Sequence, residues 1–228
     1  MPIFRLNKEL AFPDPSYAEK EGILAIGGDL SVDRLILAYA NGIFPWPRKN
    51  APLLWWSPDP RMVLYPRDYN ASKSLKQLIR SKKYTHSYDR DFASVIRECA
   101  FIPRPGQDGT WITKDMIKAY LKLHREGFAH SVETWHEGEL VGGLYGVSLG
   151  KAFFGESMFY KMRDASKFAF YHLVEVLKKW EFELIDAQQD TPHMRSLGAI
   201  SIPRDEFMEL LEHAVSHPTF KGNWNNYL

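Results

Sequence analysis

Residues 129–160, which read AHSVETWHEGELVGGLYGVSLGKAFFGESMFY, decide the fold class. They contain three strand-like runs, at 129–135, 140–149 and 151–160. Two short glycine-containing turns, Glu137-Gly138 and Leu149-Gly150, separate the runs. Turns of this kind join antiparallel neighbours. The stretch therefore predicts an antiparallel meander.

Helical patterns lie on both sides of this meander in the sequence. They occur at 72–83, 91–100, 113–126, 164–180 and 203–215, with short strands expected at 84–88 and 183–188. The longest helix carries an apolar stripe formed by Phe170, Leu173, Val174 and Leu177. Helices that flank an antiparallel sheet in this order predict an α+β fold.

Residues 1–62 differ from the rest of the chain because they hold eight of its fourteen prolines. Proline at this density interrupts helices and strands, so only short elements are expected. One helix is predicted at 32–41, where Ser31 supplies a cap and Gly42 a stop. We therefore predict a small Pro-rich N-terminal domain at 1–62 and a second domain at 63–228.

The composition excludes several functional classes. The chain has 228 residues and a net charge of +1, so it carries no general basic coat for nucleic acid. Its single cysteine, Cys99, excludes an internal disulfide. The eight histidines show no metal-ligand spacing such as H-x-x-x-H on a helix, so no metal site is predicted. No signal-like or membrane-spanning run occurs, which predicts a soluble cytoplasmic protein without a membrane partner.

A local concentration of positive charge stands out against this neutral background. Five basic residues and no acidic residue occur in the predicted helix 72–83: Lys73, Lys76, Arg80, Lys82 and Lys83. Four of them are spaced by 3, 4 and 3 residues and share one helix face. Such a face is either simply solvated or binds phosphates, and the sequence leaves both interpretations open.

Glu156 is a carboxylate within an apolar strand. Strict alternation along 151–160 places it on one face with Ala152, Phe154 and Met158. A carboxylate among such neighbours requires hydrogen-bond or cationic partners. Glu156 is therefore either a salt-bridged edge residue or a group that binds a substrate amine.

Asp186 and Gln188 form a second polar pair, in the strand expected at 183–188. Alternation puts both on one face and Ile185 on the other. The pair is either a strand end that emerges into solvent or part of a functional site.

Nine motifs follow one another along almost the whole chain. The first three are GILAIGGDLS (22–31), AYANGIFPWP (38–47) and LWWSPDPRMVLYP (54–66). The next three are GTWIT (109–113), AYLKLHREGFAHSVETW (119–135) and LVGGLYGVSLGKAFFGESMF (140–159). The last three are ASK (165–167), LIDAQ (184–188) and HMRSLGAISIPRDEF (193–207). In this order, the motifs resemble those of the leucyl/phenylalanyl-tRNA–protein transferases.

The resemblance implies a small N-terminal domain packed on a GNAT-like acyltransferase domain, whose mainly antiparallel sheet is flanked by helices. It implies transfer of leucine or phenylalanine, and less readily methionine, from aminoacyl-tRNA to the α-amine of an N-terminal Arg or Lys. The product enters N-degron proteolysis. The implied partners are Leu-tRNA, Phe-tRNA and such acceptor proteins, and a monomer without metal or other cofactor is expected.

The resemblance assigns catalysis to Asp186 and Gln188 and places Glu156 in the same site. Asp186 would hold and polarise Gln188, whose carbonyl would accept a hydrogen bond from the attacking amine. Asp186 or water would take the proton. Glu156 would hold an ammonium group of the donor or the acceptor.

Two substrate surfaces are expected beside these residues. An apolar donor side chain needs a deep, adaptable pocket. Its candidate lining residues are Trp111, Tyr120, Leu144, Phe153, Met158 and Ile185. The five basic residues of helix 72–83 are the candidates for contacting tRNA phosphates.

Two other functions are compatible with parts of the sequence. A non-catalytic binder of aminoacyl-tRNA 3′ ends would keep the basic helix and the pocket but would not need Asp186, Gln188 and Glu156 together. A coenzyme-A-dependent GNAT acetyltransferase would need a glycine-containing phosphate loop at the start of the long helix. Residues 161–166 hold no glycine, which counts against the acetyltransferase.

Overall fold

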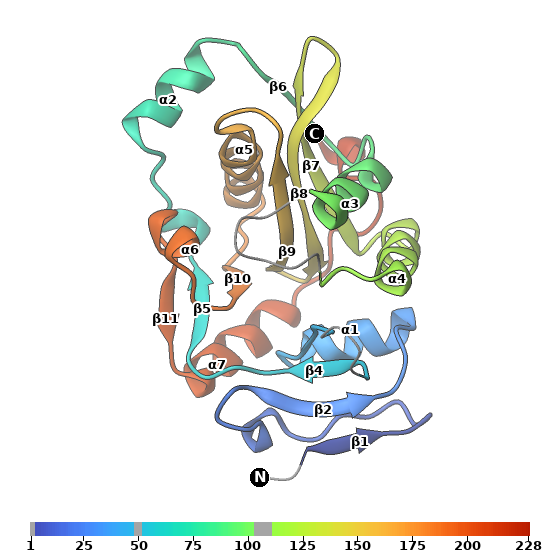
Figure 1. Cartoon of the computed structure of the whole chain (residues 1–228). Coiled ribbons are helices and arrows are strands. Elements are labelled where there is room, and N and C mark those ends of the chain that lie inside the picture. Colours follow the sequence, from blue (N-terminus) through green and yellow to red (C-terminus); the bar gives the residue numbers. More distant parts are fainter. Residues whose placement is uncertain (1–2, 48–51, 103–110) are drawn as a thin grey trace.

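The computed structural model describes residues 3–47, 52–102 and 111–228, which form two β-sheets and the helices around them (Figure 1). The smaller sheet has the strand order β1-β2-β4-β3. Its strands are β1 (Phe4–Leu6), β2 (Ile23–Gly27), β3 (Phe44–Pro45) and β4 (Leu54–Trp56). The predicted helix of this region is α1 (Val32–Ala40), which Ser31 caps by accepting a hydrogen bond from the Arg34 backbone N–H.

The larger sheet has the strand order β11-β5-β10-β9-β8-β7-β6. Its strands are β5 (Arg61–Leu64), β6 (Thr85–Tyr88), β7 (Ala129–His136), β8 (Glu139–Leu149), β9 (Ala152–Tyr160), β10 (Leu184–Gln188) and β11 (Ile200–Ile202). β9 and β10 pair in parallel, and the other neighbouring strands pair antiparallel. The predicted meander, the mainly antiparallel sheet and the α+β class are thus confirmed.

Helices cover both faces of the larger sheet. They are α2 (Lys73–Arg80), α3 (Phe92–Phe101), α4 (Lys114–Arg125), α5 (Ala165–Lys179), α6 (Pro192–Ser196) and α7 (Arg204–Val215). On one face, α5 contributes Leu173 and Leu177 to a buried cluster with Phe153 and Ile185. Residues of α3, α4 and α7 form the core on the other face, and this core continues without a break into the small sheet. The two sheets are therefore joined by apolar packing.

The predicted helices are all present, with ends that differ from the predicted ones by at most three residues. The strands β1 to β5, strand β11 and helix α6 were not predicted individually. The domain boundary predicted between 62 and 63 falls inside β5, which belongs to the larger sheet. Among the described residues, no helix combines the length and the apolarity that crossing a bilayer requires.

Candidate active site

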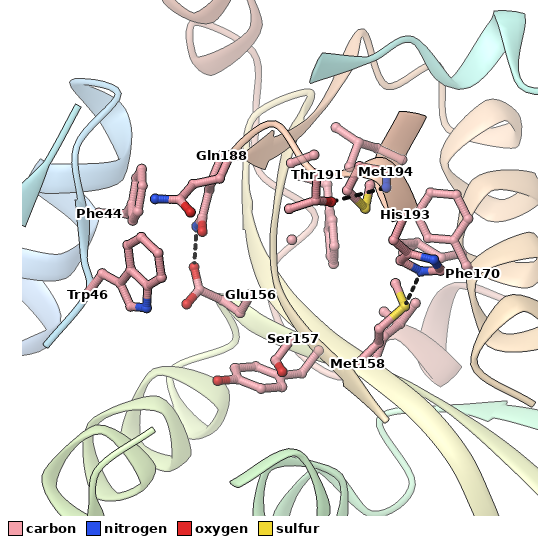
Figure 2. A pocket seen from close by; sticks show the side chains of 18 of the residues that line it. Phe44, Trp46, Glu156, Ser157, Met158, Phe170, Gln188, Thr191, His193 and Met194 are labelled. Carbon is pink, nitrogen blue, oxygen red and sulfur yellow. Dashed lines mark hydrogen bonds between the residues drawn. The ribbon is translucent and has the colours of Figure 1, made fainter. Parts of the chain in front are cut away.

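A cavity of about 340 Å³ opens where the edge of the small sheet meets the middle of the larger one (Figure 2). Five of the six predicted pocket residues line it: Trp111, Leu144, Phe153, Met158 and Ile185. The sixth, Tyr120, lies outside the lining and binds Glu156 from behind. Glu156 and Gln188 also line the cavity, so the structure brings two of the three predicted catalytic residues together with the pocket.

A β-bulge in β9 places Glu156. Tyr145 of β8 pairs with Ser157, and the next residue, Gly146, pairs with Gly155, so Glu156 has no partner in the ladder. The extra residue reverses the alternation of the strand beyond it. The prediction that Met158 shares a face with Glu156 was therefore wrong. Met158 packs instead with the cluster beneath α5, together with Phe153.

A second irregularity, in β10, places Gln188. The register with β5 shifts between Asp186 and Gln188, and Gln188 has a φ of 64°. This left-handed conformation is costly for a residue with a side chain. The Gln188 backbone N–H donates a 2.8 Å hydrogen bond to Asp186 Oδ1, which helps to hold it there. Strands that bend at a bulge commonly aim a side chain into a site.

Glu156 is the hub of the hydrogen bonds at the cavity wall. Its Oε1 accepts from the Tyr39 hydroxyl at 2.7 Å and from Gln188 Nε2 at 2.8 Å, and its Oε2 accepts from the Tyr120 hydroxyl at 3.0 Å. The two tyrosine hydroxyls also bind each other. Burial raises the pKa of Glu156 to about 7. The three hydrogen bonds lower this pKa, and the negative charge of Asp186 raises it further. A carboxyl group with this pKa can take up or release a proton near neutral pH.

Asp186 faces away from the cavity and is fully buried. Its two oxygens accept hydrogen bonds from Arg61 Nε at 2.8 Å and Arg61 Nη2 at 2.7 Å. Arg61 lies between the rings of Phe44 and Phe207, and its Nη1 donates to the Gly42 carbonyl at 3.0 Å. Arg61 thus neutralises Asp186 and ties β10 to the small sheet. The geometry makes Asp186 a positioning group for Gln188.

The predicted basic residues lie on α2 and just beyond it. Lys73, Lys76 and Arg80 belong to the helix, whereas Lys82 and Lys83 follow its end at Ser81. All five side chains are exposed. Leu75 on the opposite helix face anchors α2 in the cluster beneath α5. In Figure 1, α2 lies at the end of the molecule remote from the small sheet.

Several residues at the site were not predicted. Phe44 and Trp46 of the small sheet form one cavity wall (Figure 2), and Tyr39 of α1 holds Glu156. Their signal was the motif at 38–47, which was used only as a family resemblance. His193, which lies in α6, was not predicted either. There it lines the cavity, with its Nε2 3.3 Å from Met158 Sδ.

Two further histidines lie close to a carboxylate, outside the predicted site. His213 and His217 are four residues apart, and Glu183 lies beside them. His217 lies two residues beyond the end of α7, so the pair does not form an H-x-x-x-H spacing on one helix. This cluster is separate from the cavity.

Comparisons with known proteins agree on one family. A family model described as "Leucyl/phenylalanyl-tRNA protein transferase" matches residues 63–212, and one described as its N-terminal domain matches residues 28–59. A leucyl/phenylalanyl-tRNA–protein transferase of Anaeromyxobacter sp. is 55% identical over 225 residues, which cover 99% of this chain and 96% of the relative. One from Syntrophobacter fumaroxidans is 52% identical over 224 residues, which cover 98% and 96%.

Similarity to solved structures is weaker. The structure described as "The structure of L-PGS from Bacillus licheniformis" is 14% identical and has a TM-score of 0.40. The match covers 66% of this chain and 48% of that one. A likeness at this level does not establish a shared fold.

Proposed function

Because the chain belongs to the leucyl/phenylalanyl-tRNA–protein transferase family, and so transfers an aminoacyl group from tRNA to protein, we propose that the cavity receives the donor side chain. The proposed donors are leucine and phenylalanine, and less readily methionine. The proposed acceptor is the α-amine of an N-terminal Arg or Lys, and the modified protein then enters N-degron proteolysis. The observation that carries the proposal is a carboxyl group, Glu156, at the wall of an apolar cavity, where burial raises its pKa to about 7.

We propose that Glu156 takes the proton of the reacting amine. The donor is an ester, so its aminolysis forms one C–N bond, breaks one C–O bond and moves one proton from the amine to the ribose oxygen. The N-terminal amine has a pKa of about 7.7–8.0 in solution, close to that of Glu156 at about 7. Glu156 can therefore accept the proton from the amine and return it to the leaving oxygen. No covalent intermediate with the protein is needed.

Gln188 would orient the amine. Its Nε2 donates to Glu156, which directs the amide carbonyl oxygen to the other side as an acceptor for the attacking amine. Asp186 would act through Gln188, because Arg61 already neutralises its charge and its oxygens are directed away from the cavity. This assignment replaces the expectation that Asp186 takes the proton.

Donor selection would rest on shape. The cavity walls include Leu144, Phe153, Phe170 and Ile185, and Met158 and Met194 add two adaptable side chains. A pocket of this kind accepts the side chains of leucine, methionine and phenylalanine, which are all unbranched at Cβ. One methylene group discriminates by only about 1–3 kcal/mol, so valine and isoleucine would be rejected by clashes at their branched Cβ.

We extend the proposal to the remaining substrate and to the architecture. The exposed cations of α2 and its C-terminal end would contact tRNA phosphates without reading bases. The part of the chain from 63 to 228 would be a GNAT-like domain, with 1–62 as a small N-terminal domain, in a monomer that works in the cytoplasm where aminoacyl-tRNA is made. Family membership sets aside both the non-catalytic binder and the acetyltransferase.

A transfer assay tests the proposed specificity. The purified chain is mixed with radiolabelled Leu-tRNA and a peptide that begins with Arg, and the control peptide begins with Ala but is otherwise identical. Label should appear on the Arg peptide alone. Equal labelling of both peptides would contradict the acceptor rule, and labelling from Val-tRNA at the same rate would contradict the donor rule.

A further inference from the structure

We propose that Glu183, His213 and His217 form a Zn²⁺ site that joins the end of α7 to the start of β10. His213 lies in the last turn of α7, His217 lies two residues beyond its end, and Glu183 immediately precedes β10. Their ligand atoms all lie within 4.8 Å of one another. Within 3–47, 52–102 and 111–228, no other set of three His, Cys, Asp or Glu side chains converges in this way.

The distances fit a zinc ion. His213 Nδ1 lies 2.9 Å from Glu183 Oε2, and His217 Nε2 lies 3.2 Å from Glu183 Oε1. Ligand atoms of a tetrahedral zinc ion lie roughly 3.3 Å apart, because each bond is about 2.0–2.2 Å long. The two contacts with Glu183 are therefore close to the spacing that a tetrahedral zinc ion requires.

The ligand types also select the metal. Two imidazoles and one carboxylate suit Zn²⁺, whereas Ca²⁺ and Mg²⁺ prefer sets of oxygen ligands. Three protein ligands leave the fourth tetrahedral position for water. The partial exposure of the cluster, with 70% of the His213 side chain accessible, gives an ion a path of entry.

His217 supplies an observation independent of the spacing. Its Nε2 atom is shielded from solvent, and among the described residues it makes no hydrogen bond of acceptable geometry, although Glu183 Oε1 lies 3.2 Å away. A buried ring nitrogen without a partner is costly. A metal ion would bind this nitrogen. The competing interpretation is that each histidine forms an ion pair with Glu183. That interpretation does not explain why the nitrogen makes no hydrogen bond of acceptable geometry.

The site would act as a clamp. Glu183 is five residues before Gln188 in the chain, which is roughly 16 Å along a strand at about 3.3 Å per residue. Zinc at Glu183 would therefore touch neither the cavity nor the substrates. It would instead fasten α7, whose Ala214 carbonyl accepts a 2.8 Å hydrogen bond from the Lys151 backbone N–H, to the strand that carries Asp186.

The test is zinc binding by the untagged full-length chain. The protein is treated with a chelator, dialysed and titrated with ZnCl₂ by calorimetry, and the bound metal is counted by mass spectrometry. We expect one Zn²⁺ per chain and a melting temperature that rises by a few degrees at saturation, since a ligand that binds only the folded state stabilises it. Cobalt substitution should give the visible absorption of a tetrahedral site.

Three variants make the test specific. His213→Ala and Glu183→Gln should each lose the stoichiometric ion and the rise in melting temperature. His213 is largely exposed, so its truncation leaves no cavity that would unfold the chain. His136→Ala removes a histidine from β7, remote from the cluster, and should bind zinc as the unchanged protein does.

The result can also overturn the proposal. No saturable binding of ZnCl₂ by the wild-type chain, or equal binding by wild type and His213→Ala, would show that the cluster is only a surface ion-pair network. Transfer activity is measured in parallel and should stay unchanged in His213→Ala. The zinc site and the proposed reaction are therefore tested independently of each other.

Discussion

Glu156 titrates in the range in which the acceptor amine also titrates, so its role is visible in a pH profile. With a pKa of about 7, its basic form increases as pH rises through neutrality. Well below that value, protonation of Glu156 should lower the rate at saturating substrates by about tenfold per pH unit, in addition to the fall caused by protonation of the acceptor amine. Glu156→Gln keeps the size and most hydrogen bonds of the side chain but cannot take a proton. We expect it to lower the rate by about 10²–10⁴-fold and to remove this limb.

The measurement is single-turnover transfer to an Arg peptide between pH 5.5 and 8.5. The acceptor amine has its own titration near about 7.7–8.0, which should persist in both proteins and serves as an internal control. An unchanged acidic limb in Glu156→Gln would assign the proton transfer to another group.

The same pKa predicts that Glu156 destabilises the fold at alkaline pH. The carboxyl group binds its proton more tightly in the folded chain, at about 7, than at the unperturbed value of 4.5. Folding is therefore favoured while the group is protonated, and this advantage is lost as pH rises from 4.5 through 7. This difference in proton affinity contributes roughly 3 kcal/mol to the free energy of unfolding below pH 4.5.

Glu156→Gln should thus melt several degrees above the wild type at pH 8, and the difference should shrink towards pH 4.5. Thermal unfolding followed by fluorescence at both pH values checks this expectation. A variant that melts at or below the wild-type temperature at pH 8 would mean that the hydrogen bonds of the carboxylate outweigh its burial.

Asp186 combines a structural and a positioning role. Asp186→Asn leaves the buried Arg61 without its counter-charge. Such a change typically lowers the free energy of unfolding by about 3–5 kcal/mol and the melting temperature by roughly 10 °C. Below that temperature, transfer should be slow while aminoacyl-tRNA binding is retained, because the neutral Asn Oδ1 is a weaker acceptor for the Gln188 backbone N–H. The matched control is Asp190→Asn, which removes an exposed ion pair with Arg195 and should leave the melting temperature unchanged. Loss of tRNA binding in folded Asp186→Asn would contradict this assignment.

At the scale of single residues, the sequence predicted which side chains gather at the cavity better than where they point. Glu156, Gln188 and five of the pocket residues do meet at one cavity. The alternation rule nevertheless failed at Met158, because a bulge inserts one residue and reverses the faces beyond it. A bulge has no periodic signature in the sequence, so only the pairing of β8 with β9 reveals it.

Among the helices, α2 is the one whose charge pattern has a function to test. Lys76→Glu combined with Arg80→Glu should weaken aminoacyl-tRNA binding and reduce the slope of log K against log salt by roughly two units, because each phosphate contact contributes about 0.9. Filter binding between 50 and 200 mM KCl measures both quantities. The control is Arg5→Glu with Lys20→Glu, two exposed cations in the small domain, at the opposite end of the molecule from α2 (Figure 1). Equal slopes in the two double variants would show that α2 is merely solvated.

Element length explains which parts of the fold were predictable. The helices were recognised because an apolar stripe repeats several times, as it does over the fifteen residues of α5. The strands β3 and β4 have two and three residues and are buried throughout, so they show no alternation. Helix α6 has five residues, which is too short for a helical repeat.

At the scale of the whole molecule, the active site depends on the packing of two sheets that are distant in the sequence. The Tyr39 hydroxyl from α1 reaches Glu156, and Arg61 donates both to Asp186 and to the Gly42 carbonyl. No local sequence pattern predicts these contacts, because they form only when the small sheet packs against the larger one. The small domain therefore contributes both to the wall of the cavity and to the hydrogen bonds behind it.

Trp46 tests this dependence because it brings a wall of the cavity from the small sheet. Its ring packs on Trp56 within that sheet and lines the cavity on its other side. Trp46→Ala should raise KM for Leu-tRNA and Phe-tRNA about tenfold or more, since an aromatic ring contributes a large apolar contact. The rate at saturation should change less, because Glu156 and Gln188 keep their places.

Phe12→Ala is the matched control, since it also removes one aromatic ring from the small domain. Phe12 packs edge-on against Trp55, with ring centroids 4.8 Å apart, and does not line the cavity. It should lower the melting temperature without changing KM, whereas Trp46→Ala should change KM in a chain that remains folded. Equal effects of the two substitutions on KM would mean that the small domain acts on the site only through general stability. A rise in KM confined to Trp46→Ala would instead show that this domain contacts the donor directly.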